Sequence, residues 1–171
     1  MTSLADHEEE RLRILEETGA LAGSDPALDA ICREARDHFD VPMALITLVD
    51  RQRLRVKAAQ GLNVSELPRD TAFCTYTILS DDIFVIPDML ADERFRTNPL
   101  VLGEPHLRFY AGAPLVYLRD IRLGSLCILE MRPRLFSPGD KAELREMADR
   151  VVTEIAEQEL KALGMTLASR H

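Results

Sequence analysis

The stretch FDVPMALITLVDRQRLRVKAAQGL, residues 39–62, decides the class of fold. Its first half, residues 43–49 (MALITLV), is apolar at successive positions, which is typical of a central strand covered on both sides. A short turn, DRQR, follows it. Beyond the turn, Leu54, Val56 and Ala58 alternate with basic residues, which predicts a strand with one exposed face. The stretch is therefore expected to form a hairpin.

A second pair of strands is expected nearer the C-terminus. Residues 110–117 and 121–130 are two apolar stretches joined by a Leu-Arg-Asp turn. One face of the later strand is expected to carry Leu123, Ser125, Cys127 and Leu129. A shorter apolar strand is predicted at residues 83–86. Because successive hairpins require an antiparallel sheet, and helical segments flank them, the fold class is α+β.

Helices are expected at both ends of the chain. Residues 5–22 are charged, with a narrow apolar stripe that is typical of a seam between helices. A second helix begins after Ser24-Asp25-Pro26, a capping residue followed by proline, and buries Cys32 in its apolar face. The last helix opens at Ser137-Pro138-Gly139-Asp140 and has a stripe too wide for one neighbour. The first helix is its expected companion.

These segments define the predicted organisation. Residues 1–22 form an N-terminal helix and a candidate dimer seam, residues 23–163 form one domain that includes the C-terminal helix, and residues 164–171 form a tail. We expect a homodimer paired through the terminal helices.

Composition narrows the classes of function. The 171 residues carry a net charge of -8 with a pI near 5.0, which argues against binding nucleic acid or an anionic membrane surface. The N-terminal segment has no apolar core typical of a secretory signal, and no apolar run reaches the roughly 20 residues needed to span a bilayer. Cys32, Cys74 and Cys127 are too far apart in sequence for a disulfide framework or a zinc pair. A cytoplasmic protein without a metal site is expected.

The stretch PRDTAFCTYTIL, residues 68–79, is the first candidate for a site. Asp70 or Thr71 is a suitable N-cap for a short helix over residues 72–79, whose N-terminus would favour an anionic ligand. Arg69, immediately before it, could add a charge-assisted hydrogen bond. Cys74 has three possible roles, which in descending order are a pocket-lining or core residue, a redox-sensing thiol and a catalytic nucleophile.

The remaining candidates come from a long connection and the strand that follows it. Residues 88–109, from Asp88 onward, have the length of a binding loop or lid. The further candidate ligand contacts are Phe73 and Tyr76 as aromatic walls, His106, Arg108 as a cation, and Phe109 and Tyr110 as aromatic walls. The alternative is that Asp70 pairs with an arginine, Phe73 fills the core and the pocket is packed shut.

Four segments, taken in order, resemble the successive signatures of a GAF domain. They are residues 39–62, residues 68–79, RFYAGAPL at 108–115 and RLGSLCILE at 122–130. The resemblance covers about residues 20–160 and is to the bacterial branch that precedes histidine kinases and diguanylate cyclases or stands alone. It implies a six-stranded antiparallel sheet, with N- and C-terminal helices on one face and a loop-covered pocket on the other. A PAS domain is the runner-up.

The resemblance implies several functions, and the residues test each one. In the lineage that reduces free methionine sulfoxide, the reactive cysteine lies in the segment that here reads HLRFYAGAPL, which has none; Cys74 is also expected to lack a resolving partner. Covalent bilin needs a Cys-His pair, and here His106 stands without a cysteine. Haem on His106 remains open. The Asn-Lys signature typical of cyclic-nucleotide binders is absent.

The prediction is a non-enzymatic sensory module that binds a small ligand, dimerises, or does both. Its cofactor is unknown, with no covalent bilin expected, and a histidine kinase or cyclase is the expected output partner. The alternatives are a thiol-based redox enzyme or sensor centred on Cys74, and a module that serves only for dimerisation.

Overall fold

The computed structural model describes residues 4–164, apart from the side chains of residues 4 and 71. The strands are β1 (Met43–Val49), β2 (Arg53–Gln60), β3 (Glu66–Pro68), β4 (Phe84–Ile86), β5 (Phe109–Leu118) and β6 (Ile121–Glu130). The helices are α1 (Leu4–Thr18), α2 (Pro26–Phe39), α3 (Cys74–Thr77), α4 (Pro99–Leu102) and α5 (Pro138–Ala162), with 3-10 turns η1 (Arg69–Thr71) and η2 (Met89–Ala91). Apart from Gly164, the predicted tail lies outside the described residues.

The six strands form one antiparallel sheet in the order β3-β2-β1-β6-β5-β4. Both predicted hairpins are present as β1-β2 and β5-β6, and they meet where β1 pairs with β6. Five strands follow from the residue pattern, whereas β3 does not, because three residues carry too little alternation to identify a strand. The α+β class and the six-stranded sheet are confirmed.

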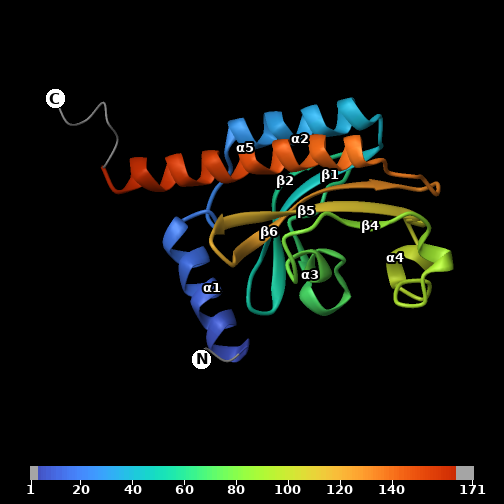
Figure 1. Ribbon diagram of the computed structural model, residues 1–171, viewed down its shortest axis with the longest axis horizontal. Helices are drawn as coiled ribbons and strands as arrows, with labels where there is room; N and C mark the ends of the chain where they lie inside the picture. The colour runs from blue at the N-terminus through green and yellow to red at the C-terminus, as the bar shows by residue number, and fades with distance from the viewer. Residues whose placement is uncertain (1–3, 165–171) are drawn as a thin grey trace.

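The long helices α2 and α5 begin where capping chemistry predicts. Asp25 caps α2 by accepting a hydrogen bond from the Ala27 amide at 2.9 Å, with proline at the first helical position. Ser137 and Asp140 form a reciprocal capping box at the start of α5. Both helices lie side by side on one face of the sheet (Figure 1).

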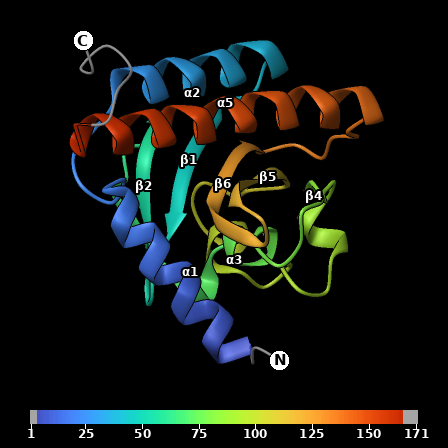
Figure 2. The ribbon, with the colours of Figure 1, turned by 60° about the vertical axis from the view of Figure 1, so that its left-hand side comes forward.

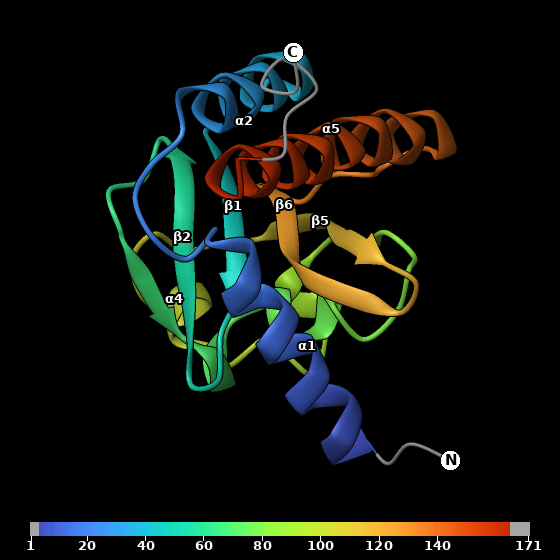
Figure 3. The ribbon, with the colours of Figure 1, turned by 90° about the vertical axis from the view of Figure 1, so that its left-hand side faces the viewer.

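Helix α1 contacts α5, as predicted, but α2 makes the more extensive contact with α5. Helix α1 crosses the sheet near one of its ends, and the N-terminal end of α1 lies away from α5 (Figures 2 and 3). Helix α2 is therefore the main neighbour of α5. Leu12, Ile14 and Leu15 of its apolar stripe are buried within the protomer. The stripe is therefore already covered inside one copy of the chain.

The sheet separates two clusters of apolar side chains, and a bulge in β2 decides which of its residues belong to each cluster. The β1-β2 register shifts between Ile46 and Thr47, opposite Val56 and Ala58. As a result, Leu54 faces the side without α2 and α5, whereas Ala58 packs under those helices. The prediction that Leu54, Val56 and Ala58 share one face is wrong for this reason. The prediction for β6 is wrong in the same way. Leu123 packs in the cluster under α2 and α5, whereas Cys127 and Leu129 pack in the cluster on the opposite face of the sheet.

Among residues 4–164, none of the helices is long and apolar enough to span a membrane. Within the same residues, no three His, Cys, Asp or Glu side chains gather in a way that could hold a metal ion.

Candidate functional site

A cavity of about 340 Å³ lies on the face of the sheet opposite α2 and α5. Its floor is the sheet itself, and α3, α4 and the loops around them form its walls. The lining residues are Met43, Leu45, Leu54, Leu62, Val64, Leu67, Ala72, Phe73, Cys74, Leu100, Glu104, Pro105, Leu107, Tyr110, Cys127 and Leu129. The volume falls in the range of sites for small organic molecules.

The walls of this cavity are almost entirely hydrocarbon. Met43 and Leu45 alternate along β1, and Cys127 and Leu129 alternate along β6, so that each strand contributes every second side chain. Glu104 is the one acidic residue in the described lining, and arginine and lysine do not occur there. The cavity therefore presents an almost entirely apolar surface.

The polar end of the cavity lining includes Cys74 and Tyr110, and buried hydroxyl groups outside the lining are hydrogen-bonded to both. The Cys74 sulfur accepts a hydrogen bond from Ser125 Oγ at 3.0 Å and one from the Tyr110 hydroxyl at 3.4 Å. The Tyr110 hydroxyl lies 2.7 Å from Thr77 Oγ1, and Ser125 Oγ lies 3.3 Å from Thr47 Oγ1. All five residues are buried, so these groups depend on each other rather than on solvent.

Cys127 completes this polar end. The neighbouring Cys127 thiol is the largest cause that lowers the pKa of Cys74; hydroxyl groups add to the effect, while burial opposes it. The same contact, together with burial, raises the pKa of Cys127. Cys74 is thus the more acidic thiol of the pair. The prediction that Cys74 lacks a neighbouring thiol is wrong, because β6 carries Cys127 beneath α3.

Three of the predicted contact residues line the cavity, namely Phe73, Cys74 and Tyr110. Phe109 does not, because consecutive strand residues point to opposite faces and its ring packs against Phe136 on the helix side. Tyr76 also lies outside the lining, on the exposed side of α3, where it stacks on Phe84 and contacts Phe95. The two predicted walls Phe109 and Tyr76 are therefore wrong.

The predicted polar contacts serve the fold instead. Arg108 donates to the carbonyls of Val101 and Leu107, and Asp88 accepts from the Leu90 amide at the start of η2. Asp70 and His106 are exposed and lie outside the lining, although Glu104 beside His106 belongs to it. Of Thr71, only the backbone is described.

The predicted capping of the short helix is also wrong. The helix α3 spans a single turn, Cys74–Thr77, and its N-cap is Phe73, which makes no side-chain hydrogen bond. Asp70 and Thr71 lie instead inside the turn η1. An anion site on this helix terminus is therefore not supported.

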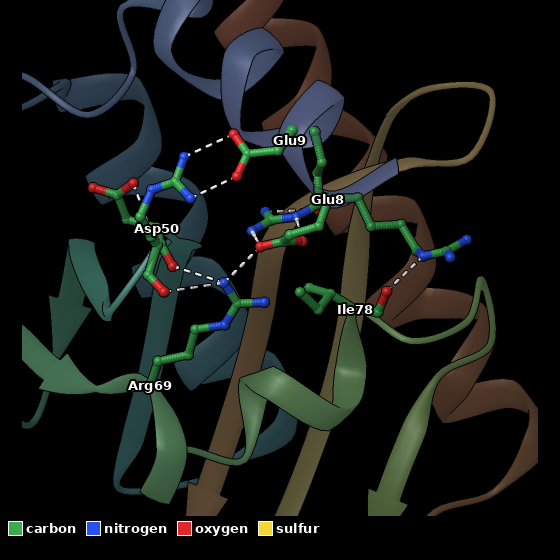
Figure 4. Close-up of polar contacts among 8 residues, drawn as sticks. Glu8, Glu9, Asp50, Arg69 and Ile78 are labelled. Carbon is green, nitrogen blue, oxygen red and sulfur yellow. Dashed lines mark hydrogen bonds and ion pairs between the residues drawn. The ribbon is translucent and has the colours of Figure 1, made fainter. Parts of the chain in front are cut away.

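Arg69 connects the cavity wall to α1. Its guanidinium donates to Glu8 Oε2 at 2.7 Å and to the Asp50 carbonyl at 3.0 Å, and Glu8 also accepts from Arg11 at 2.8 Å (Figure 4). Burial raises the pKa of Glu8, but the hydrogen bonds and charges of the two arginines outweigh it and lower the pKa to about 2. The Glu8 carboxylate is thus a charged link between α1 and the segment that leads into Ala72.

The comparisons with known proteins agree with this architecture. The model of the GAF domain matches residues 24–155, and the chain belongs to the GAF domain family. It is 40% identical over 147 residues to a cyclic di-GMP phosphodiesterase of Pseudomonas aeruginosa, which covers 85% of this chain and 24% of that enzyme. The chain therefore spans about a quarter of that relative. Together these matches support a signalling or sensory module.

Two solved structures show the same fold. The GAF domain of an Acinetobacter phosphoenolpyruvate-protein phosphotransferase has a TM-score of 0.68 at 25% identity, covering 92% of this chain and 96% of that one. A free methionine-R-sulfoxide reductase of Neisseria meningitidis has a TM-score of 0.63 at 18% identity, covering 95% of this chain and 97% of that one. The second likeness concerns the fold alone.

Proposed function

We propose that this GAF domain is a cytoplasmic, non-enzymatic sensor whose ligand is a compact, uncharged and mainly apolar molecule. The observation that carries the proposal is the cavity of about 340 Å³ with its hydrocarbon walls and one polar end. An apolar body fits the walls, and a single hydrogen-bonding group on the ligand fits beside Tyr110, whose hydroxyl belongs to the polar end of the lining.

A cyclic nucleotide fits this cavity poorly. Its phosphate would enter without a basic partner, because arginine and lysine are absent from the described lining. Burying a charged group without a partner carries a large free-energy penalty. Arg69 and Arg108, the two cations predicted to meet an anion, are engaged elsewhere by Glu8 and by backbone carbonyls.

The route from ligand to output begins at the cavity wall. Ala72, Phe73 and Cys74 line the cavity, and Arg69 lies three residues before Ala72. A ligand that shifts this segment also shifts the Arg69–Glu8 pair and with it α1. The differential contacts of the ligand with the two positions of this segment would set the population of each.

The output is proposed to be a change in how two copies of the chain pair. Leu160 and Leu163, near the C-terminal end of α5, are exposed and offer an apolar surface for a homodimer. A cyclic di-GMP enzyme or a histidine kinase is the proposed reader. The support for such a reader is the curated relative, in which a similar segment is a part of a larger phosphodiesterase.

The ligand class is tested with N-phenyl-1-naphthylamine, an uncharged apolar dye whose fluorescence rises when it leaves water. We expect saturable binding of one dye per chain, weakened at least about tenfold by Ala72→Leu, which fills the cavity. The matched control is Ala91→Leu, at an exposed position, which should leave the affinity unchanged. Equal loss in both variants, or displacement of the dye by cyclic nucleotides, would sink the proposal.

The relay is tested by hydrogen exchange of α1 with and without the same dye. The dye should change α1 exchange in the native chain and not in Arg69→Ala, because that variant lacks the link to Glu8. Arg13→Ala removes an exposed ion pair within α1 and should preserve the response. A response that persists in Arg69→Ala would show that the signal takes another route.

A further inference from the structure

We propose that Cys74 and Cys127 form a thiol pair that an apolar organic hydroperoxide oxidises to a disulfide at the floor of the cavity. This oxidation goes beyond the proposed ligand sensing. It does not depend on a bound ligand and requires only that the peroxide enter the cavity. It assigns a modification site to residues that lie 53 positions apart in sequence and on different elements, α3 and β6.

The geometry brings together everything that the reaction needs. Both residues belong to the lining of the cavity that the peroxide would enter. Ser125 Oγ lies 3.0 Å from the Cys74 sulfur, and Cys127 follows Ser125 by two residues on the same face of β6, which places its thiol beside Cys74. Hydrogen bonds from Ser125 and Tyr110 stabilise negative charge on the Cys74 sulfur, and the thiolate is the nucleophilic form of cysteine.

The first step is a two-electron oxidation of Cys74. Its sulfur attacks the terminal oxygen of the hydroperoxide, the S–O bond forms and the O–O bond breaks. The proton of the Cys74 thiol passes through the neighbouring hydroxyl groups to the departing alkoxide, which leaves as an alcohol. The sulfur is oxidised to the sulfenic acid and the peroxide is reduced.

The second step is resolution by Cys127. Its sulfur attacks the Cys74 sulfur, the S–S bond forms and the S–O bond breaks. The departing hydroxide takes the proton of the Cys127 thiol and leaves as water. In total, two thiols and one hydroperoxide give one disulfide, one alcohol and one water.

The apolar walls of the cavity determine which class of oxidant is expected. An alkyl or aryl hydroperoxide buries its hydrocarbon body against Leu45, Leu54 and Leu129, whereas hydrogen peroxide has no such body to bury. A larger body therefore raises the occupancy of the cavity beside the sulfur, and the rate rises with it.

Cys32 provides a control within the same chain. It is buried on the helix side of the sheet, where its thiol donates to the Ala44 carbonyl at 3.0 Å. Burial is the main cause that raises the pKa of Cys32 to about 12. Cys32 is buried like Cys74 and Cys127, but it lies outside the cavity lining. The thiol of Cys32 should therefore remain reduced.

The test treats the full chain with equal amounts of cumene hydroperoxide or hydrogen peroxide and maps the cysteines by mass spectrometry. We expect a Cys74–Cys127 cross-link that forms at least about tenfold faster with cumene hydroperoxide. No cross-link, or oxidation of Cys32 at the same rate, would overturn the pair. Equal rates with the two oxidants would overturn the assigned class.

Variants separate the two steps. Cys127→Ser should stop the reaction at a Cys74 sulfenic acid that dimedone labels, Cys74→Ser should give neither product, and Cys32→Ser should behave as the native chain. If a variant does not fold, the peptide map of the native chain still decides. The dye experiment uses no oxidant, so the failure of one proposal is distinguishable from the failure of the other.

Discussion

The two faces of the sheet are built from neighbouring residues of the same strands, yet they differ in kind. Under α2 and α5 lie aliphatic and aromatic side chains such as Phe109, Leu115 and Leu126. On the other face, Tyr110 and Cys127, each adjacent in sequence to one of these residues, line a cavity, and the Tyr110 hydroxyl is hydrogen-bonded to the buried hydroxyl of Thr77. One face is packed, and the other keeps space and polar groups.

This difference indicates which face stabilises the fold and which face carries the proposed site. A face filled with close-packed hydrocarbon contributes to the stability of the domain. A face that retains a cavity loses those contacts, and buried hydroxyls add a requirement for mutual hydrogen bonds. Space and polar groups kept at some cost in stability are expected at a functional site.

The largest expected effect is a difference between leucines on the two faces. Leu115→Ala should reduce the free energy of unfolding by about 4 kcal/mol, because it opens a hole in a packed region. Leu54→Ala should cost about 2.5 kcal/mol, since Leu54 already borders a cavity and has fewer contacts to lose. Urea unfolding followed by circular dichroism measures both. Equal costs would remove the distinction between the faces.

The hydroxyl network of the cavity face should have the next largest effect. Thr77→Val keeps the shape but removes the 2.7 Å hydrogen bond to Tyr110, and we expect a loss of about 1–2 kcal/mol in unfolding free energy. Thr153→Val, on the exposed side of α5, is the control and should change stability by less than about 0.5 kcal/mol. A neutral Thr77→Val would indicate that the network relaxes without cost.

Glu8 sharpens the comparison by showing how the cavity face is connected to α1. Its folded pKa of about 2 lies below the ordinary value of 4.5, so its contribution is complete above pH 4.5 and is lost as the pH falls toward 2. Glu8→Gln should therefore flatten the fall in stability across that range and cost about 1 kcal/mol at neutral pH, a small value because solvent reaches a third of the side chain.

The measurement for Glu8 is the urea midpoint as a function of pH. Glu17→Gln breaks a well-exposed pair with Arg13 and serves as the control. An identical pH profile for Glu8→Gln and the native chain would contradict the assignment of Glu8 as the link.

The smallest expected effect concerns the outer edge of the cavity face. Arg94 lies over the rings of Tyr76, Phe84 and Phe95 and pairs with Asp92. Because Arg94 is half-exposed, Arg94→Ala should reduce stability by no more than about 1 kcal/mol. The same unfolding assay measures it. A larger loss would place this aromatic cluster among the elements that hold the fold.

Most of the fold follows from the residue pattern. The features that were not predicted depend on how one strand pairs with another. The hairpins and the starts of α2 and α5 depend on alternation and capping, which are properties of neighbouring residues. The bulge in β2 is not visible in the sequence, because Leu54, Val56 and Ala58 alternate with basic residues without a break, and only pairing with β1 shows the extra residue between Val56 and Ala58.

The candidate site was predictable only in part, for a related reason. The stretch around Cys74 was identified, but its partner Cys127 lies on a strand whose place beneath α3 depends on the order of the sheet. Arg69 and Arg108 are the residue types that bind anions, and nothing in their local sequence shows that Glu8 or backbone carbonyls already occupy them. The leucines of the cavity wall look like ordinary core residues.

The sequence by itself determined the class of fold, the family resemblance and the three residues Phe73, Cys74 and Tyr110 at the cavity. These depend on short-range spacing, which a chain carries before it folds. The tertiary structure alone decided that the cavity is apolar, that Cys74 has a neighbouring thiol and that Glu8 holds Arg69. Such contacts join residues far apart in sequence, and they exist only once the strand order and the crossing of α1 are set.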